Sequence, residues 1–217
     1  MSRALARPIT YLITAGETSS ATRPESEEFG RLLALVRAAA AARVTLVQLR
    51  EKSLTGRVLF ELASAAAHAA RGSGTRVLVN DRADVARAAR CDGVHLTTNS
   101  LEASEVRRAF GEDFLIGVSA HTIDEARAAR AGGADFAVFG PVFDTPSKRA
   151  YGPPVGLEAL TKAALDLSPF PLVALGGVGE DEVEKVLQAG AAGVAGIRLF
   201  ANGQNLARIV HHIGRVR

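Results

Sequence analysis

The sequence predicts a (β/α)8 barrel on the strength of three observations. Short apolar runs alternate with alanine- and arginine-rich helical runs along all 217 residues. The alternation gives eight strand-then-helix units. Polar residues follow the apolar runs, whereas the residues that precede them are small and apolar. An open doubly wound sheet is the alternative, but it calls for a glycine-rich fingerprint after the first strand, which residues 14–17 (TAGE) do not supply.

The strands are expected at the apolar runs that are short and rich in β-branched residues. In chain order these are Ile9–Thr14, Val44–Leu49, Val77–Val79, Gly93–Leu96, Leu115–Val118, Phe136–Phe139, Leu172–Leu175 and Gly193–Ile197.

The helices are expected between the strands, where the apolar residues have the spacing of a helix. In chain order these are Phe29–Ala42, Thr55–Arg71, Ala83–Arg90, Ala103–Phe110, Ile123–Ala131, Leu157–Leu167, Glu180–Ala189 and Asn205–Ile213. Thr122 is a suitable N-cap, and Glu125 is placed to complete a capping box.

Three joints between a helix and the next strand resemble one another, at residues 89–94, 132–137 and 189–194. Each ends a helix with a small residue or glycine and enters the strand through another small residue. Together with the absence of a linker or low-complexity tract, the repeat predicts one domain over residues 1–217.

The composition excludes several classes of protein. The net charge is +3, and the arginines are scattered through helical runs, so no nucleic-acid surface is expected. The single cysteine, Cys91, excludes an intramolecular disulfide and a cysteine-cluster metal site, and its place at a strand entrance predicts a small buried residue. No apolar run approaches the roughly 18 residues of a membrane span. Residues 1–8 do not resemble a secretory signal, so we expect a cytoplasmic protein.

Polar residues recur where the strands end, which is where a barrel of this kind places its active site. The residues concerned are Gln48, Arg50, Lys52, Asn80, Asp81, His95, Ser119, His121, the 145–148 loop, Gly176, Gly177, Gly196 and Arg198. Taken singly, each has a plainer interpretation: residues 50–52 as a solvated charge run, residues 80–81 as a turn, His121 as part of a helix cap. Their recurrence at nearly every strand end favours one shared site for a phosphorylated small molecule.

Six segments together resemble the thiamine phosphate synthase family, whose superfamily also holds the related thiazole tautomerases. They are Val47–Lys52 (VQLREK), Val79–Arg82 (VNDR), Gly93–Leu96 (GVHL), Gly117–Thr122 (GVSAHT), Gly140–Lys148 (GPVFDTPSK) and Ala174–Val178 (ALGGV). The resemblance runs from Tyr11 to Ile197. It implies a transferase of thiamine biosynthesis that joins hydroxymethylpyrimidine diphosphate to thiazole phosphate and releases pyrophosphate.

The resemblance also implies roles for the residues at the strand ends. Gln48, Arg50, Lys52, Asn80 and Lys148 would hold the pyrimidine diphosphate, and Ser119 would contact the same substrate. The thiazole phosphate pocket would be formed by Thr145, Pro146, Ser147 and Gly177 with the residues after the last strand, Ile197 and Arg198. The expected catalytic residues are Ser119, His121 and Lys148. Asp81 would ligate Mg²⁺, a hard cation that prefers carboxylate and phosphate oxygens.

The chain departs from the family pattern at two places. The family's synthases carry a second aspartate ligand for magnesium where this chain has Ser100, so weaker Mg²⁺ binding is expected. Arg198 stands where they carry a serine, and it either binds phosphate or points outward.

Two alternative functions remain open on the sequence. A thiazole tautomerase would use His121 as acid and base and would need no metal. A non-catalytic binder of thiazole or thiamine phosphate is the other. The residues suited to a diphosphate favour the synthase. The expected partners are small phosphorylated substrates, with neither nucleic acid nor membrane, and a homodimer is left open.

Overall fold

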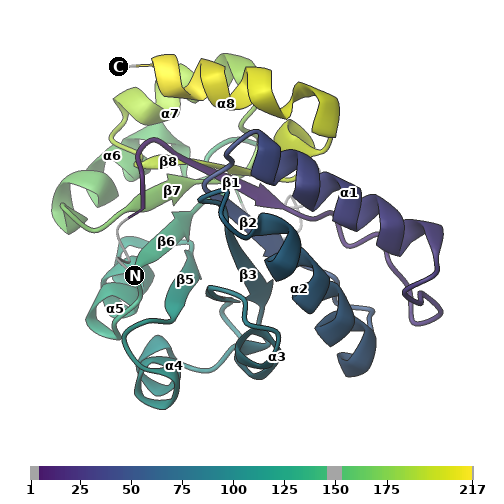
Figure 1. Cartoon of the computed structure of the whole chain (residues 1–217). Coiled ribbons are helices and arrows are strands. Elements are labelled where there is room, and N and C mark those ends of the chain that lie inside the picture. Colours follow the sequence, from purple (N-terminus) through teal and green to yellow (C-terminus); the bar gives the residue numbers. More distant parts are fainter. Residues whose placement is uncertain (1–4, 146–152, 217) are drawn as a thin grey trace.

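A closed barrel of eight parallel strands forms the centre of the computed structural model, which describes residues 5–145 and 153–216. Each strand pairs with the next in sequence, and β8 pairs with β1. The helices lie outside the strands (Figure 1). The strands are β1 (Ile9–Ile13), β2 (Leu46–Leu49), β3 (Arg76–Asn80), β4 (Gly93–Leu96), β5 (Leu115–Ala120), β6 (Phe136–Phe139), β7 (Leu172–Ala174) and β8 (Gly193–Gly196). The predicted fold class is confirmed.

An α-helix follows each strand. The helices are α1 (Glu27–Ala41), α2 (Gly56–Ala70), α3 (Ala83–Ala88), α4 (Ala103–Phe110), α5 (Ile123–Ala131), α6 (Gly156–Leu167), α7 (Val183–Gln188) and α8 (Leu206–Arg215). Within the described part of the chain, no helix is both long and apolar enough to cross a membrane.

The predicted helices differ from the observed ones mainly at their ends. The expected helix at 180–189 begins as a 3-10 turn, η2 (Glu180–Glu182), before α7, and another such turn, η4 (Gly203–Asn205), precedes α8. A third, η3 (Arg198–Phe200), follows β8. Helix α3 ends at Ala88 rather than Arg90, because Arg90 adopts a left-handed backbone with φ 58°.

Both faces of the strands are buried, as expected for parallel strands covered by helices. Successive side chains point alternately into the barrel and toward the helices. The interior cluster comprises Ile9, Tyr11, Ile13, Leu46, Leu78, Phe136, Val138, Val173, Ala192 and Ala195. A larger cluster fills the layer between strands and helices.

The repeated joint between helix and strand has a common backbone geometry. A left-handed residue ends the helix at Arg43, Arg90, Gly133 and Gly190, with φ of 58°, 58°, 84° and 94°. The next N–H then bonds to a carbonyl five residues back, as Cys91 does to Ala86 at 2.9 Å. The joint at Arg43 was not predicted. Cys91 is buried as expected, and burial raises the pKa of its thiol to about 12.

An aspartate in two of the joints fixes the start of the neighbouring strand. The carboxylate of Asp92 accepts from Val77 N, and that of Asp135 accepts from Ile116 N, both at 2.8 Å. Asp135 also pairs with Arg107 at 2.8 Å, and each of these side chains is about a tenth exposed (9% and 11%). The corresponding pair between Asp92 and Arg76 is more open, at 28% and 24%.

We predict that Asp135→Ala lowers the free energy of unfolding by about 3 kcal/mol, because it leaves the buried guanidinium of Arg107 without its carboxylate. Asp92→Ala is the matched control: it removes the same kind of strand-start bond but leaves a better solvated arginine, so roughly half the loss is expected. Urea denaturation of both variants measures the difference. Equal losses would contradict the role of burial.

Candidate active site

Four polar side chains converge inside the barrel where β2, β3, β4 and β5 end. Gln48, Asn80 and His95 are 1%, 8% and 3% exposed, and Ser119 is half-buried. All four are predicted site residues or strand-end residues, and the strand register brings them together: Asn80 lies opposite His95, and His95 lies opposite Gly117. This end of the barrel is therefore polar, whereas the interior below it is apolar.

The three charged residues that follow β2, at positions 50–52, differ in burial from one to the next, as the alternation of side chains along an extended chain predicts. Arg50 is half-buried, and its backbone N–H donates to Thr14 Oγ1 at 2.8 Å. Lys52 is exposed. Glu51 points the other way and is only 3% exposed.

Glu51 holds the loop that follows β1. Its carboxylate accepts from the backbone N–H of Gly16 (3.2 Å) and of Thr18 (3.3 Å), and from the Thr18 hydroxyl (2.8 Å). A solvated charge run is therefore the wrong description of this position. Apart from the alternation of side chains, no local pattern predicts this role for Glu51, because its partners lie more than thirty residues away in the chain.

The exit of β3 presents oxygen atoms. Asn80 Oδ1 is buried and has no hydrogen-bond partner among the described residues, while Asn80 Nδ2 donates to Asp81 Oδ2 at 3.3 Å. Asp81 is exposed and adopts a left-handed backbone with φ 61°, a conformation that aspartate tolerates better than most residues.

Ser100 lies against Asp81. Its hydroxyl donates to Asp81 Oδ1 and accepts from Thr97 N at 2.6 Å. Ser100, where the resemblance implies a second aspartate, therefore places a neutral oxygen in contact with the Asp81 carboxylate.

These oxygens suit a hard cation. An amide oxygen without a partner, a carboxylate and a hydroxyl are the donor types that Mg²⁺ accepts, and Mg²⁺ is commonly bound by one or two carboxylates together with substrate phosphates. Across residues 5–145 and 153–216, no group of three His, Cys, Asp or Glu side chains is arranged to hold a metal by itself. The residues therefore fit Mg²⁺ only when the substrate adds further oxygens.

A buried polar network crosses the barrel beneath this face. Gln48 Nε2 donates to Tyr11 Oη at 2.9 Å, Tyr11 Oη lies 3.1 Å from His95 Nδ1, and His95 Nε2 lies 3.0 Å from Ser119 Oγ. Burial lowers the pKa of His95 to about 4 and outweighs the opposing effect of Asp81. Burial also raises the pKa of the Tyr11 phenol above its usual range. Tyr11 was not predicted as a site residue, because its position early in β1 is typical of a core residue.

His121 follows β5, and its Nδ1 donates to the carbonyl oxygen of Gly140, the residue after β6. Thr122 caps α5 as predicted, by accepting from Glu125 N at 3.1 Å. The Glu125 carboxylate bonds to His121 N at 2.6 Å, so the capping box is displaced by one residue.

The loops after β6 and β7 lie against each other. Val142 N donates to Leu175 O (2.8 Å) and Phe143 N donates to Gly176 O (2.9 Å). A Cβ on Gly177 would lie 2.8 Å from Asp144 O, so only glycine permits this approach. Thr145, which follows Asp144 in the chain, is buried. Pro146, Ser147 and Lys148 lie outside the described residues.

Two predicted site residues, Ile197 and Arg198, follow β8. Ile197 packs on the interior cluster, and Arg198 begins η3 with an exposed side chain.

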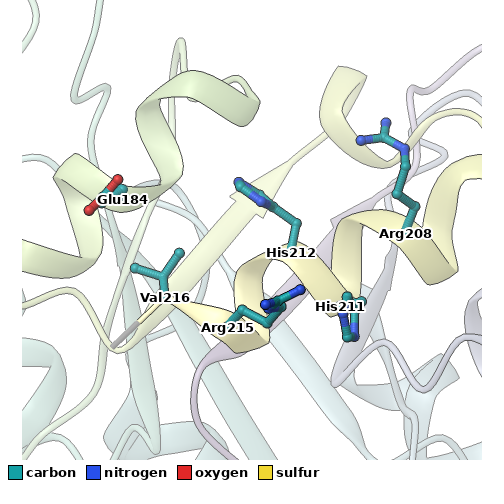
Figure 2. A pocket seen from close by; sticks show the side chains of 6 residues that line it. All are labelled: Glu184, Arg208, His211, His212, Arg215 and Val216. Atoms are coloured by element: carbon teal, nitrogen blue, oxygen red, sulfur yellow. The ribbon is translucent and has the colours of Figure 1, made fainter.

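A separate hollow of about 460 Å³ lies on the outer surface between α7 and α8. Glu184 lines it from α7, and Arg208, His211, His212 and Arg215 line it from α8 (Figure 2). Arg208 is paired there with Glu180 at 2.7 Å. None of the predicted site residues lines this hollow, so the strand ends remain the candidate active site.

Known proteins with similar sequences and structures bear on this site. The family described as thiamine monophosphate synthase matches residues 11–200. A thiamine-phosphate synthase from Moorella thermoacetica is 40% identical over 85% of this chain and 87% of its own length, and one from Chlorobium luteolum is 38% identical over 91% and 87%. The thiamine phosphate pyrophosphorylase structure from Pyrococcus furiosus superposes with a TM-score of 0.75 at 26% identity and covers 94% of this chain and 96% of that one. The match spans every strand that contributes to the site, and the chain therefore belongs to the thiamine monophosphate synthase family.

Proposed function

We propose that this protein is a thiamine phosphate synthase, a transferase of thiamine biosynthesis that forms a C–N bond between hydroxymethylpyrimidine diphosphate and thiazole phosphate and releases pyrophosphate. The observation that carries the proposal is the set of strand-end residues in a chain 40% identical to a thiamine-phosphate synthase over 85% of its length. The proposal includes a single barrel domain over residues 1–217 and a cytoplasmic location, and it leaves a homodimer open.

In this reaction the bond between the pyrimidine methylene carbon and the diphosphate oxygen breaks, and the thiazole nitrogen forms the new bond to that carbon. The negative charge that develops on the leaving pyrophosphate is the main demand on the site. Arg50, Lys52 and Lys148 are the cations we assign to it. The half-buried position of Arg50 supports its part, because water screens a charge less where it is partly excluded.

The pyrimidine is assigned to the buried polar residues. Gln48 and Asn80 offer amide groups, and Ser119 offers a hydroxyl at the open end of the network. The unpartnered oxygen of Asn80 supports a ligand in this place, because a buried acceptor without a partner costs free energy until something donates to it.

The thiazole phosphate is assigned to Thr145, Pro146, Ser147 and Gly177, with Ile197 and the adjoining Arg198. The close contact of the loops after β6 and β7 supports this, since it brings Asp144, the residue before Thr145, next to the left-handed Gly177.

Asp81, with Ser100 in contact with it, is the group we assign to Mg²⁺. When bound, Mg²⁺ would neutralise charge on the departing pyrophosphate. Ser100 holds Asp81 through its hydroxyl but adds no charge, so this chain would depend more on substrate oxygens than a relative with two carboxylates.

The direct test supplies both substrates with and without Mg²⁺ and detects thiamine phosphate by mass. Magnesium-dependent product supports the proposal. Turnover of a thiazole carboxylate phosphate without metal, lost in His121→Ala and retained in Asp81→Ala, would instead identify a tautomerase. Ligand-induced stabilisation without any turnover would identify a binder.

We predict that Arg50→Ala lowers kcat/KM by the equivalent of about 2–4 kcal/mol, because it removes a charge-assisted contact to the leaving group. Lys148→Ala is expected to do the same. Steady-state kinetics measures the loss, and urea denaturation is expected to change by no more than about 0.5 kcal/mol. Arg108→Ala in the last turn of α4 is the matched control, since its side chain is 77% exposed and the helices end on the face opposite the carboxyl ends of the strands. Unchanged kinetics in both site variants would reject the assigned pyrophosphate site.

A second prediction concerns Ser100. Ser100→Asp is expected to tighten Mg²⁺ binding in the presence of pyrophosphate, because a hard cation gains from a second anionic oxygen. Without metal the same variant is expected to melt at a lower temperature, since two carboxylates then repel each other. Calorimetric titration and thermal melting measure these effects.

Asp81→Ala is expected to abolish the calorimetric Mg²⁺ signal, and Asp84→Ala, which removes a 64% exposed carboxylate on α3, is the control. If Ser100→Asp left Mg²⁺ affinity unchanged, the metal would lie elsewhere.

A further inference from the structure

The network of Gln48, Tyr11, His95 and Ser119 joins four strands through three hydrogen bonds. It begins at β2, passes through the Tyr11 hydroxyl on β1 and the His95 ring on β4, and ends at Ser119 on β5. Tyr11 is fully buried and His95 is 3% exposed, so water does not substitute for these bonds. The two middle residues have no role in the assignments above.

With the Gln48 amide nitrogen directed at Tyr11, the hydrogen bonds can be satisfied with only one direction of donation. Tyr11 Oη accepts from the Gln48 amide, so its single proton is free for its other neighbour, His95 Nδ1. Because Nδ1 then accepts, the ring carries its proton on Nε2 and donates to Ser119 Oγ. The Ser119 proton is thereby left for a ligand. A proton on Nδ1 would leave the buried Tyr11 proton without an acceptor.

The surrounding packing keeps the two rings in this geometry. Phe136 meets Tyr11 edge-on, with ring centroids 5.6 Å apart at 80°. Gly117 makes room for the rings of Phe136 and His95, since a Cβ there would lie 2.4 Å from Phe136 Cζ and 2.9 Å from His95 Nδ1. This packing therefore holds the rings of Tyr11 and His95 in one arrangement.

We propose that Tyr11 and His95 are positioning residues, which fix the Ser119 hydroxyl as a hydrogen-bond donor toward the pyrimidine substrate and couple its direction to that of the Gln48 amide. This inference rests on the proposed function for the identity of the substrate, but the direction of the hydrogen bonds can be tested without turnover. Two neutral side chains orient the group that faces the ligand, and neither needs to touch it.

The first experiment locates the proton on His95. Nitrogen-15 NMR of the imidazole rings at pH 7.5 in the full chain distinguishes a proton on Nε2 from one on Nδ1, and the signal missing from His95→Gln assigns the residue. A proton on Nε2 is expected. A proton on Nδ1, or a doubly protonated ring, would overturn the proposal, whether or not the protein turns over.

The second experiment separates positioning from packing. Tyr11→Phe keeps the ring and removes the hydroxyl, and we expect kcat to fall about tenfold with little change in KM for thiazole phosphate. In a Ser119→Ala background the same change should have almost no further effect, because Tyr11 acts through Ser119. Ile9→Val, at the start of the same strand and in the same interior cluster, is the control and is expected to lower stability but not kcat.

A rescue variant covers the case in which Tyr11→Phe fails to fold. The amide nitrogen of His95→Gln takes the place of Nε2 as a donor, so this variant should retain several-fold more kcat than His95→Leu. Equal losses in the two variants, or full additivity of Tyr11→Phe with Ser119→Ala, would overturn the proposal in an active enzyme. A wild-type protein without synthase turnover would reject the proposed function alone, and the NMR result would still decide the network.

Discussion

Closure of the parallel sheet between β8 and β1 is the constraint on which the site depends. Gly193 lies opposite Ile9 in this last pair, and a Cβ there would lie 2.0 Å from the Ile9 carbonyl oxygen. No other residue type allows the two strands to approach so closely. Once the ladder is closed, the carboxyl ends of all the strands lie on one side of the barrel. Residues as distant in the chain as Gln48 and Arg198 are thereby brought to one face.

The barrel interior changes character along its axis. Ile9, Leu46, Leu78 and Val173 fill it with apolar side chains, whereas Gln48, Asn80 and His95 occupy the strand ends. Buried polar groups weaken a core unless each is paired, and Asn80 Oδ1 is a fully buried atom of this layer with no partner among the described residues. This unpaired oxygen is consistent with a layer that a ligand completes.

Much of this arrangement could be predicted from the sequence, because strand alternation and helix caps are local signals. The eight units, the joints at Gly133 and Gly190, and the polar strand ends all follow from such patterns. Tyr11 and Glu51 could not be identified, since their partners are set by the register between strands rather than by neighbours in the chain. At Ser100 the sequence motif shows where the chain departs from the family pattern, but only the structure reveals the hydrogen bond from Ser100 to Asp81.

The alternation of side chains after β2 has a consequence for how the protein tolerates substitution. Arg50 is half-buried and Lys52 is exposed, while Glu51 between them is buried and holds residues 16–18. Tolerance to substitution therefore changes from one residue to the next over three positions. Replacing either outer side chain leaves the hydrogen bonds of the middle carboxylate in place, whereas replacing Glu51 releases the loop after β1.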